Sequence, residues 1–201
     1  RRENLVGIIN GINPADWDPE HDRVIEAHFS ARNLEGKKTC KLAVQKENHL
    51  KQDPKIPLFG FIGRLAEQKG IDLLAPVVEE MARENWQLVV LGTGEEEYHK
   101  LLRLLQKRHP EHLGLNITFD PKMAKRIYSG IDMFLMPSRY EPCGLGPMFA
   151  LRFGSVPIVR ETGGLVDMIQ KFDANTGKGN GFIFPGYKPG DLWDTMKQAV
   201  Q

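Results

Sequence analysis

Cysteine and long apolar runs are scarce in this chain of 201 residues. The two cysteines, Cys40 and Cys143, are too few for a disulfide framework, so a reducing compartment is the simpler interpretation. No apolar run approaches the roughly 18 residues of a membrane-spanning helix, and no signal peptide is visible. We therefore expect no membrane partner.

An excess of charge of one sign is also missing. The chain has 27 basic and 26 acidic residues, and its basic pairs, such as Lys37-Lys38, are short. A nucleic-acid-binding surface normally requires a basic patch or tail, so we expect no nucleic-acid partner. The six histidines show no metal-ligand spacing, and we expect no metal.

Two common nucleotide-binding motifs are absent as well. No Gly-x-x-x-x-Gly-Lys-Ser/Thr loop occurs, which excludes a P-loop NTPase. No Gly-x-Gly-x-x-Gly follows the first predicted strand, which argues against a dehydrogenase.

What is present, from residue 55 to residue 201, is a regular alternation of short apolar runs with stretches of helical period. This alternation predicts a Rossmann-like, doubly wound α/β domain with a parallel sheet. The predicted strands are 58–62, 87–91, 116–119, 133–136, 156–159 and 181–184. The predicted helices are 71–83, 95–108, 121–128, 145–153, 165–172 and one from residue 190 onward.

Residues 1–54 do not follow this alternation. They contain an apolar run at 6–13, a loop at 16–19 and a predicted helix at 40–50. We interpret them as a lead-in from a domain junction that packs on the edge of the α/β domain. Because the chain starts without methionine and stops inside a predicted helix, we expect it to be part of a longer protein.

Unusual residues follow the predicted strands, at the sheet edge where open α/β sheets bind ligands. After the first strand, Arg64 and Lys69 lie in one glycine-bounded loop that opens into a helix. Two such cations suit a diphosphate, because arginine offers a fork of donors and lysine a compact charge. Taken alone, this spacing is also common in surface loops whose charges only face water.

The segment Glu141-Pro-Cys-Gly-Leu-Gly146 follows the fourth strand. Its glycines permit close approach of the backbone to a ligand, and the N–H groups that start the next helix favour an anion. Glu141 suits sugar hydroxyls better than phosphate, although a helix N-terminus alone also favours a carboxylate. Thr162-Gly-Gly164 repeats the pattern after the fifth strand. Cys143 is interpreted as a small packed residue near the site.

These motifs together resemble one enzyme family. Gly63-Arg-Leu-x-x-Gln-Lys-Gly70, Pro137-Ser-Arg-Tyr-Glu-Pro-Cys-Gly-Leu145 and Thr162-Gly-Gly-Leu-x-Asp167 occur in the order and approximate spacing of glycogen and starch synthases. Gly11-Ile-Asn-Pro-Ala-Asp-Trp-Asp-Pro19 is also similar to that family, so the resemblance covers nearly the whole chain.

The resemblance implies the C-terminal, donor-binding half of a GT-B glycosyltransferase. Such an enzyme transfers glucose with retention from a nucleotide sugar, usually ADP-glucose, to an α-1,4-glucan bound through the missing N-terminal domain. The resemblance implies no cofactor and no metal. The implied compartment is the cytoplasm, or the plastid in a plant or alga. This chain alone is expected to be inactive.

The resemblance also implies roles for individual residues. Arg64 and Lys69 are expected to hold the diphosphate, and Glu141 the glucose hydroxyls. The remaining donor-binding candidates lie on the same rim: Phe119 against the base, backbone amides of Gly144, Leu145 and Gly146 on the distal phosphate, and Cys143, Thr162 and Gly163 nearby.

The sequence departs from the family pattern at two places within its motifs, and it also lacks the Lys-x-Gly-Gly-Leu loop that the family carries in the other domain. Gly146-Pro147 stands where the family usually has Thr-Gln or a similar polar pair, which removes a hydroxyl contact to phosphate. Phe149 stands where many retaining relatives carry a second Glu for the ribose. Two alternatives therefore stay open: a catalytically degenerate synthase-like domain that binds glucan or a partner, and another retaining GT-B transferase, such as a sucrose or trehalose type.

Overall fold

The computed structural model describes residue 6 and residues 8–201 of the chain. Residues 1–5 and 7, which belong to the predicted lead-in and its apolar run, lie outside the described part. Six parallel strands form one sheet in the order β3-β2-β1-β4-β5-β6. The strands are β1 (Leu58–Ile62), β2 (Gln87–Gly92), β3 (Leu113–Ile117), β4 (Met133–Met136), β5 (Val156–Arg160) and β6 (Phe182–Phe184).

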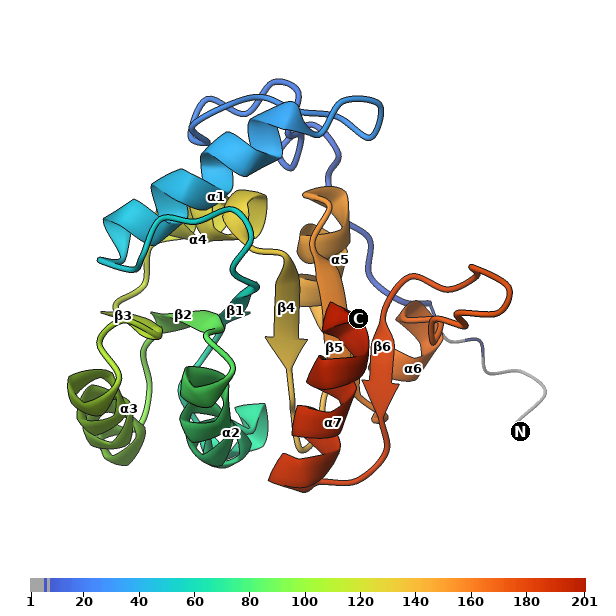
Figure 1. Cartoon of the computed structure of the whole chain (residues 1–201). Helices are drawn as coiled ribbons and strands as arrows, with labels where there is room; N and C mark the ends of the chain where they lie inside the picture. The colour runs from blue at the N-terminus through green and yellow to red at the C-terminus, as the bar shows by residue number, and fades with distance from the viewer. Residues whose placement is uncertain (1–5, 7) are drawn as a thin grey trace.

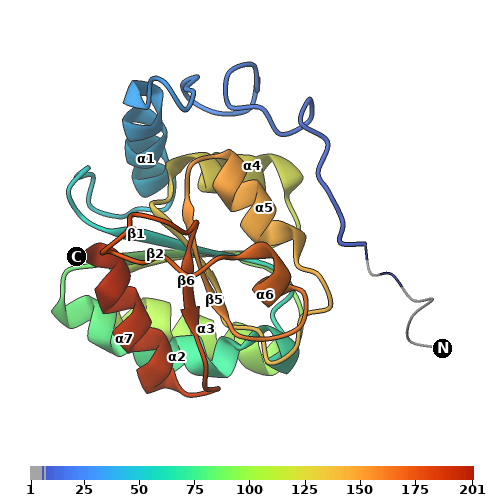
Figure 2. The same cartoon turned by 90° about the vertical axis from the view of Figure 1, so that its right-hand side faces the viewer.

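Helices cover both faces of this sheet (Figures 1 and 2). One face carries α2 (Ile71–Arg83), α3 (Glu96–Arg108) and α7 (Pro189–Val200). The other carries α1 (Glu35–Glu47), α4 (Pro121–Gly130), α5 (Leu145–Arg152) and α6 (Leu165–Met168). Alternate residues of a strand point to opposite faces, so Leu88 and Val90 join one core while Val89 and Leu91 join the other. The predicted doubly wound α/β fold is confirmed.

The strand order places a switch point between β1 and β4. Chain order runs outward from β1 to β3 on one side and from β4 to β6 on the other. The loops that leave β1 and β4 therefore diverge in opposite directions, and a crevice opens beyond their carboxyl ends. A 3₁₀ turn, η2 (Glu67–Lys69), lies in the loop after β1.

Three predicted elements differ from the structure by three or more residues at one end or both. The third strand lies at Leu113–Ile117 rather than 116–119, because Leu113 pairs with Leu88 and leaves Phe119 in the following loop. The sixth helix ends at Met168 rather than 172, because Lys171 already bridges Gly181 in extended pairing.

The helix predicted at 40–50 spans Glu35–Glu47. It ends early because the chain turns there: the side chain of Asn48 donates to the carbonyl of Val44, and His49 has a φ of 57°.

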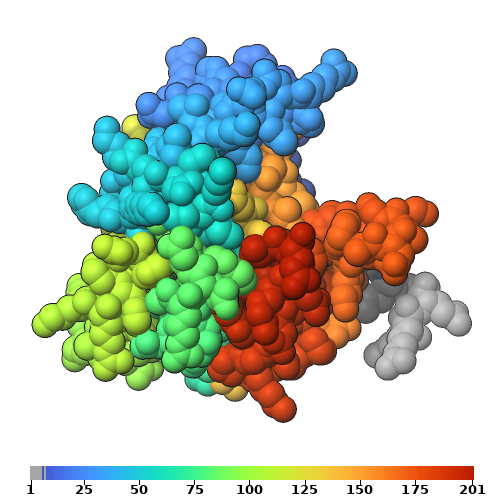
Figure 3. All heavy atoms as spheres, in the orientation of Figure 1, coloured from blue at the N-terminus to red at the C-terminus, as the bar shows by residue number. Residues whose placement is uncertain are grey.

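The segment before β1 shares its core with the sheet. Cys40 and Val44 of α1 pack in the same cluster as Leu58 and Val89, and α1 lies beside α4. Lys41 Nζ lies 2.6 Å from Asp132 Oδ2 at the start of β4. Figure 3 shows this segment in blue and cyan, seated on the rest of the molecule. A domain boundary at residue 54 stays a proposal.

Across the part of the chain described here, no helix has the length and apolar character to cross a bilayer.

Candidate functional site

Two adjoining hollows lie beyond the carboxyl ends of the strands. The larger has a volume of about 640 Å³ and the smaller about 410 Å³. Ile62, Tyr128 and Phe149 line both. The larger hollow is further lined by Trp17, Gly63, Arg64, Leu91, Gly92, Thr93, Gly94, Thr118, Phe119, Asp120, Pro121 and Ala124. The smaller is further lined by Asn10, Lys69, Met136, Glu141, Pro142, Cys143, Gly144, Leu145 and Gly146.

Lys69 and Glu141 are paired at the smaller hollow. Lys69 Nζ lies 2.5 Å from Glu141 Oε2, and the Ser138 hydroxyl donates to the same oxygen at 3.2 Å. Only 6% of Glu141 is exposed, so its charge requires a partner, since an unpaired buried charge is costly. Neither bond uses Oε1, the second carboxylate oxygen of Glu141.

The loops that carry this pair are in direct backbone contact. Gly70, which ends η2, has a φ of 76°, and a Cβ there would lie 2.2 Å from the carbonyl oxygen of Pro137. Any side chain at this position would separate the loop after β1 from the loop after β4. Gly70 therefore permits the close approach that brings Lys69 to Glu141.

Arg64 belongs to the same loop as Lys69 but lines the larger hollow. Its side chain is exposed, and its Nη2 donates to Gln68 Oε1 at 2.9 Å. The two cations predicted to act together therefore lie one at each hollow, and Lys69 is the last residue of η2.

The N-terminus of α5 borders the smaller hollow. Gly144 is its N-cap, with a φ of 87°, and Leu145 and Gly146 are its first two residues. The first backbone N–H groups of a helix have no partner within it, so this end is suited to an anion. Cys143 is a free, half-buried cysteine beside it.

The glycines in this turn have close neighbours. A Cβ on Gly144 would lie 2.8 Å from Leu165 Cδ2, and one on Gly146 would lie 2.8 Å from Phe134 Cζ. A side chain at position 146 therefore requires the Phe134 ring to shift. Pro147 is the third residue of α5 and has no backbone N–H. The N–H groups of the first helical turn have no partner within the helix, so no helical hydrogen bond is lost.

Thr162 and Gly163 belong to the turn after β5, which packs against the backbone of Glu141. A Cβ on Gly163 would lie 2.0 Å from the carbonyl oxygen of Glu141, and the Gly164 N–H donates to that oxygen at 3.0 Å. Neither Thr162 nor Gly163 is among the described residues that line the two hollows. This turn supports the backbone of Glu141.

Phe119 projects at the mouth of the larger hollow, with 83% of its surface exposed. The next residue, Asp120, caps α4: its Oδ1 accepts the N–H groups of Lys122 and Met123, each at 2.9 Å. These bonds lower the pKa of Asp120. The cap fixes the turn on which Phe119 stands.

The aromatic wall of the larger hollow was not predicted from sequence. Trp17 stacks on Phe149, with ring centroids 3.6 Å apart and an interplanar angle of 14°. Tyr128 meets both rings edge-on, and burial raises its pKa. Trp17 was visible only as part of a loop, Asp16-Trp-Asp-Pro19, whose partner lies 132 positions later in the sequence. Phe149, which stands where many retaining relatives carry a second Glu, thus stacks on Trp17 instead of presenting a carboxylate.

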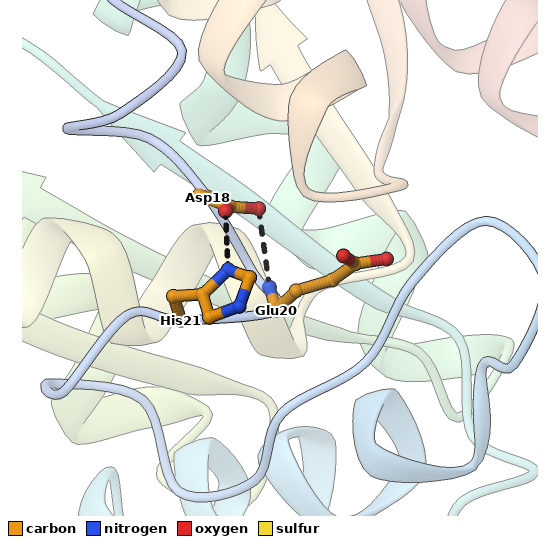
Figure 4. A group of neighbouring side chains, drawn as sticks. All are labelled: Asp18, Glu20 and His21. Carbon is orange, nitrogen blue, oxygen red and sulfur yellow. Dashed lines mark hydrogen bonds and ion pairs between the residues drawn. The ribbon is translucent and has the colours of Figure 1, made fainter.

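Asp18, Glu20 and His21 are the one group of described residues whose ligand atoms are close enough for a metal ion. Asp18 Oδ2 lies 2.7 Å from His21 Nδ1, while Oδ1 accepts the Glu20 N–H and a guanidinium N–H of Arg152. Figure 4 shows the bonds of Asp18 to the His21 ring and to the Glu20 backbone N–H, neither of which involves the Glu20 carboxylate. Hydrogen bonding raises the pKa of His21 and lowers that of Asp18. We interpret this group as a hydrogen-bonded network at the surface and do not assign a metal site to it.

Comparisons with known proteins agree with this geometry. A family model described as "Glycosyl transferases group 1" matches residues 44–201. The chain is 46% identical over 201 residues to a glycogen synthase of Alkaliphilus metalliredigens and 47% identical over 199 residues to one of Kosmotoga olearia. These alignments cover 100% and 99% of the chain, and 42% of each relative.

Among solved structures, the catalytic domain of starch synthase IV from Arabidopsis thaliana, bound to ADP and acarbose, superposes with a TM-score of 0.92. It is 32% identical, and the match covers 99% of this chain and 42% of that one.

Proposed function

The chain belongs to the glycosyl transferases group 1 family, and we propose that it is the nucleotide-sugar-binding part of a glycogen or starch synthase. Its sheet and helices form one Rossmann-like half of the GT-B architecture. The chain spans about two fifths of the length of the curated relatives it matches, so the complete reaction is proposed for a longer protein. The observation that carries the proposal is the Lys69–Glu141 pair beside the α5 N-terminus, at the switch point of the sheet.

The donor's diphosphate would lie between Arg64, Lys69 and the N-terminus of α5. The leaving group of a nucleotide-sugar transfer is a nucleoside diphosphate, on which negative charge develops as the sugar departs. Fixed cations and free backbone N–H groups stabilise that charge, because they need no reorganisation during the reaction. In this proposal, Arg64, Lys69 and the α5 N-terminus supply the positive charge that the leaving diphosphate requires.

The nucleoside and the sugar would occupy the two different hollows. The larger hollow, with its Trp17–Phe149 wall and with Phe119 at its mouth, suits an aromatic base. The smaller hollow places Glu141 beside Lys69, and its second carboxylate oxygen, Oε1, suits a sugar hydroxyl. The ADP and acarbose in the starch synthase IV structure support ADP-glucose as donor and an α-1,4-glucan as acceptor.

Calorimetric titration of this chain with ADP, UDP and ADP-glucose tests the proposal. We expect saturable binding of ADP and ADP-glucose, weaker binding of UDP, and loss of binding in an Arg64→Ala, Lys69→Ala double variant. Preference for UDP would favour another retaining transferase of the same architecture. Equal binding by the double variant would overturn the assignment of the two cations.

A second candidate is a degenerate domain that binds glucan or a partner, to which the Gly146-Pro147 departure gives weight. The structure of α5 reduces that weight. Pro147 occupies a helical position whose N–H is unpaired in any helix, and the amides of Leu145 and Gly146 remain at the hollow. A folded chain that binds glucan but none of the three nucleotides would favour this candidate.

A further inference from the structure

The turn η2 contacts the loop after β4 through three consecutive residues. Glu67 Oε1 lies 3.1 Å from Arg139 Nη2, and Lys69 Nζ lies 2.5 Å from Glu141 Oε2. Gln68 lies between them, and its carbonyl oxygen accepts the N–H of Arg139 at 2.8 Å. The two segments therefore run side by side in register.

The side chain of Gln68 bridges two groups at once. Its Oε1 accepts from Arg64 Nη2 at 2.9 Å, and its Nε2 donates to the carbonyl oxygen of Tyr140 at 3.1 Å. Tyr140 immediately precedes Glu141, so one carboxamide connects the guanidinium at the larger hollow to the backbone beside the carboxylate at the smaller one. An amide side chain can do both at once, because it carries an acceptor oxygen and a donor NH₂ group.

We propose that Gln68 is a positioning residue that holds the guanidinium of Arg64 in the orientation that binds the donor's diphosphate. The inference rests on the proposed function of the site. Arg64 is exposed, and a free arginine side chain loses substantial rotamer entropy when it binds a ligand. A hydrogen bond already formed to Gln68 reduces that loss, because the guanidinium is oriented before the ligand arrives.

Other contacts join the two loops without the Gln68 side chain: the Glu67–Arg139 and Lys69–Glu141 ion pairs, and the Arg139 N–H that donates to the Gln68 carbonyl oxygen. The Arg139 guanidinium packs 4.2 Å from the ring centroid of Tyr187, and Tyr187 donates to Asp72 Oδ1 at 2.6 Å. The backbone of Glu141 is fixed separately by the Gly164 N–H. Loss of the Gln68 side chain should therefore free Arg64 while the fold persists.

A double-mutant cycle with this chain separates positioning from simple bracing. Gln68→Met keeps the side-chain length and removes both hydrogen bonds. We expect it to weaken ADP binding about tenfold, and to have no further effect in an Arg64→Ala background, because Gln68 acts through Arg64. The same factor in both backgrounds would overturn the proposal. Gln198→Met, on the exposed side of α7, is the matched control, and unfolding midpoints verify that each variant is folded.

Nitrogen-15 NMR of the arginine side chains provides a readout that needs no nucleotide. We expect the Arg64 guanidinium to rotate measurably faster in Gln68→Met and in the shorter Gln68→Asn than in the wild type. An unchanged rotation rate would contradict the proposal even if ADP binding weakened. If the wild-type chain bound no nucleotide, the proposed function would fail, while the rotation rate would still decide whether Gln68 orients Arg64.

Discussion

Lys69 and Glu141, 72 positions apart in the sequence, form an ion pair with an Nζ–Oε2 distance of 2.5 Å. The pair joins the loop that leaves β1 to the loop that leaves β4, across the point where the sheet order reverses. Both side chains line the smaller hollow, so the pair brings a cation and a carboxylate to the same place.

The first prediction concerns the sugar. Glu141→Gln should weaken ADP-glucose binding about tenfold and leave ADP binding within about twofold, because Glu141 is assigned to sugar hydroxyls and not to phosphate. Parallel calorimetric titrations measure the two affinities. In a complete synthase containing this segment, Glu141→Ala and Lys69→Ala should each lower turnover by about 10²–10³. Near-normal turnover in either variant would refute the assigned roles.

The second prediction concerns the charges of the pair. The Glu141 side chain is 8% exposed and that of Lys69 19%, so an unpaired Glu141 is the more costly of the two. Lys69→Met should therefore destabilise the fold by more than Glu141→Gln, by about 1–3 kcal/mol. The double variant should be more stable than the sum of the single effects predicts. Urea unfolding of the four proteins measures this coupling, and strictly additive effects would mean that the pair contributes nothing to stability.

The third prediction concerns Lys37 in α1. Its Nζ donates to the carbonyl oxygens of Ser129 and Phe153 and to the Ser155 hydroxyl, all neutral acceptors, and burial lowers the pKa of Lys37 to about 8. The unfolded chain keeps the ordinary value of 10.5 and so binds more protons between these two pH values. Folding stability should therefore rise with pH across this window, by on the order of 2–3 kcal/mol.

Lys37→Met isolates this effect from the titration of other groups. The difference in unfolding free energy between the wild type and the variant should be constant below about pH 8 and should shift in favour of the wild type as the pH rises toward 10.5. Urea unfolding at several pH values measures it. A difference independent of pH would show that the folded protein keeps Lys37 charged throughout.

The sheet was predictable because its signal is local. Runs such as Leu58–Ile62 and Met133–Met136 are nearly continuous in apolar residues, as strands buried on both faces require, and the glycines and charges that follow them mark the binding edge. The third strand was misplaced because Leu113 and Gly114 carry no stronger pattern than the residues after them, and pairing with β2 decides the register.

The site was only partly predictable because its decisive contacts are long-range. The motifs pointed to Lys69 and Glu141 separately, but no local period shows that the two side chains meet. The stacking of Trp17 on Phe149 joins the lead-in to α5, and nothing near either residue in the sequence indicates the other. Likewise, the Thr162-Gly-Gly164 pattern does not show that Gly163 packs directly against the carbonyl oxygen of Glu141.

The fourth prediction concerns the glycine in the first turn of α5. A Cβ at Gly146 would lie 2.8 Å from Cζ of Phe134, a ring that is 1% exposed, so Gly146→Thr should destabilise the fold by about 1–3 kcal/mol. Phe134→Leu removes that ring atom but leaves a cavity, at a cost of about 1–2 kcal/mol. Together the two changes should cost less than their sum, because the new side chain occupies the vacated space.

The same double variant tests what the glycine does at the site. With Phe134 shortened, we expect the methyl group of the Thr side chain to fill the vacated space and its hydroxyl to face the smaller hollow, which Gly146 lines, as an added donor for the distal phosphate. We therefore expect ADP to bind several-fold more tightly to the double variant than to Phe134→Leu alone. Thermal unfolding and calorimetric titration of the four proteins measure both effects. Unchanged affinity would mean that the distal phosphate lies away from this turn. Binding of the diphosphate would then be assigned to Arg64 and Lys69 alone.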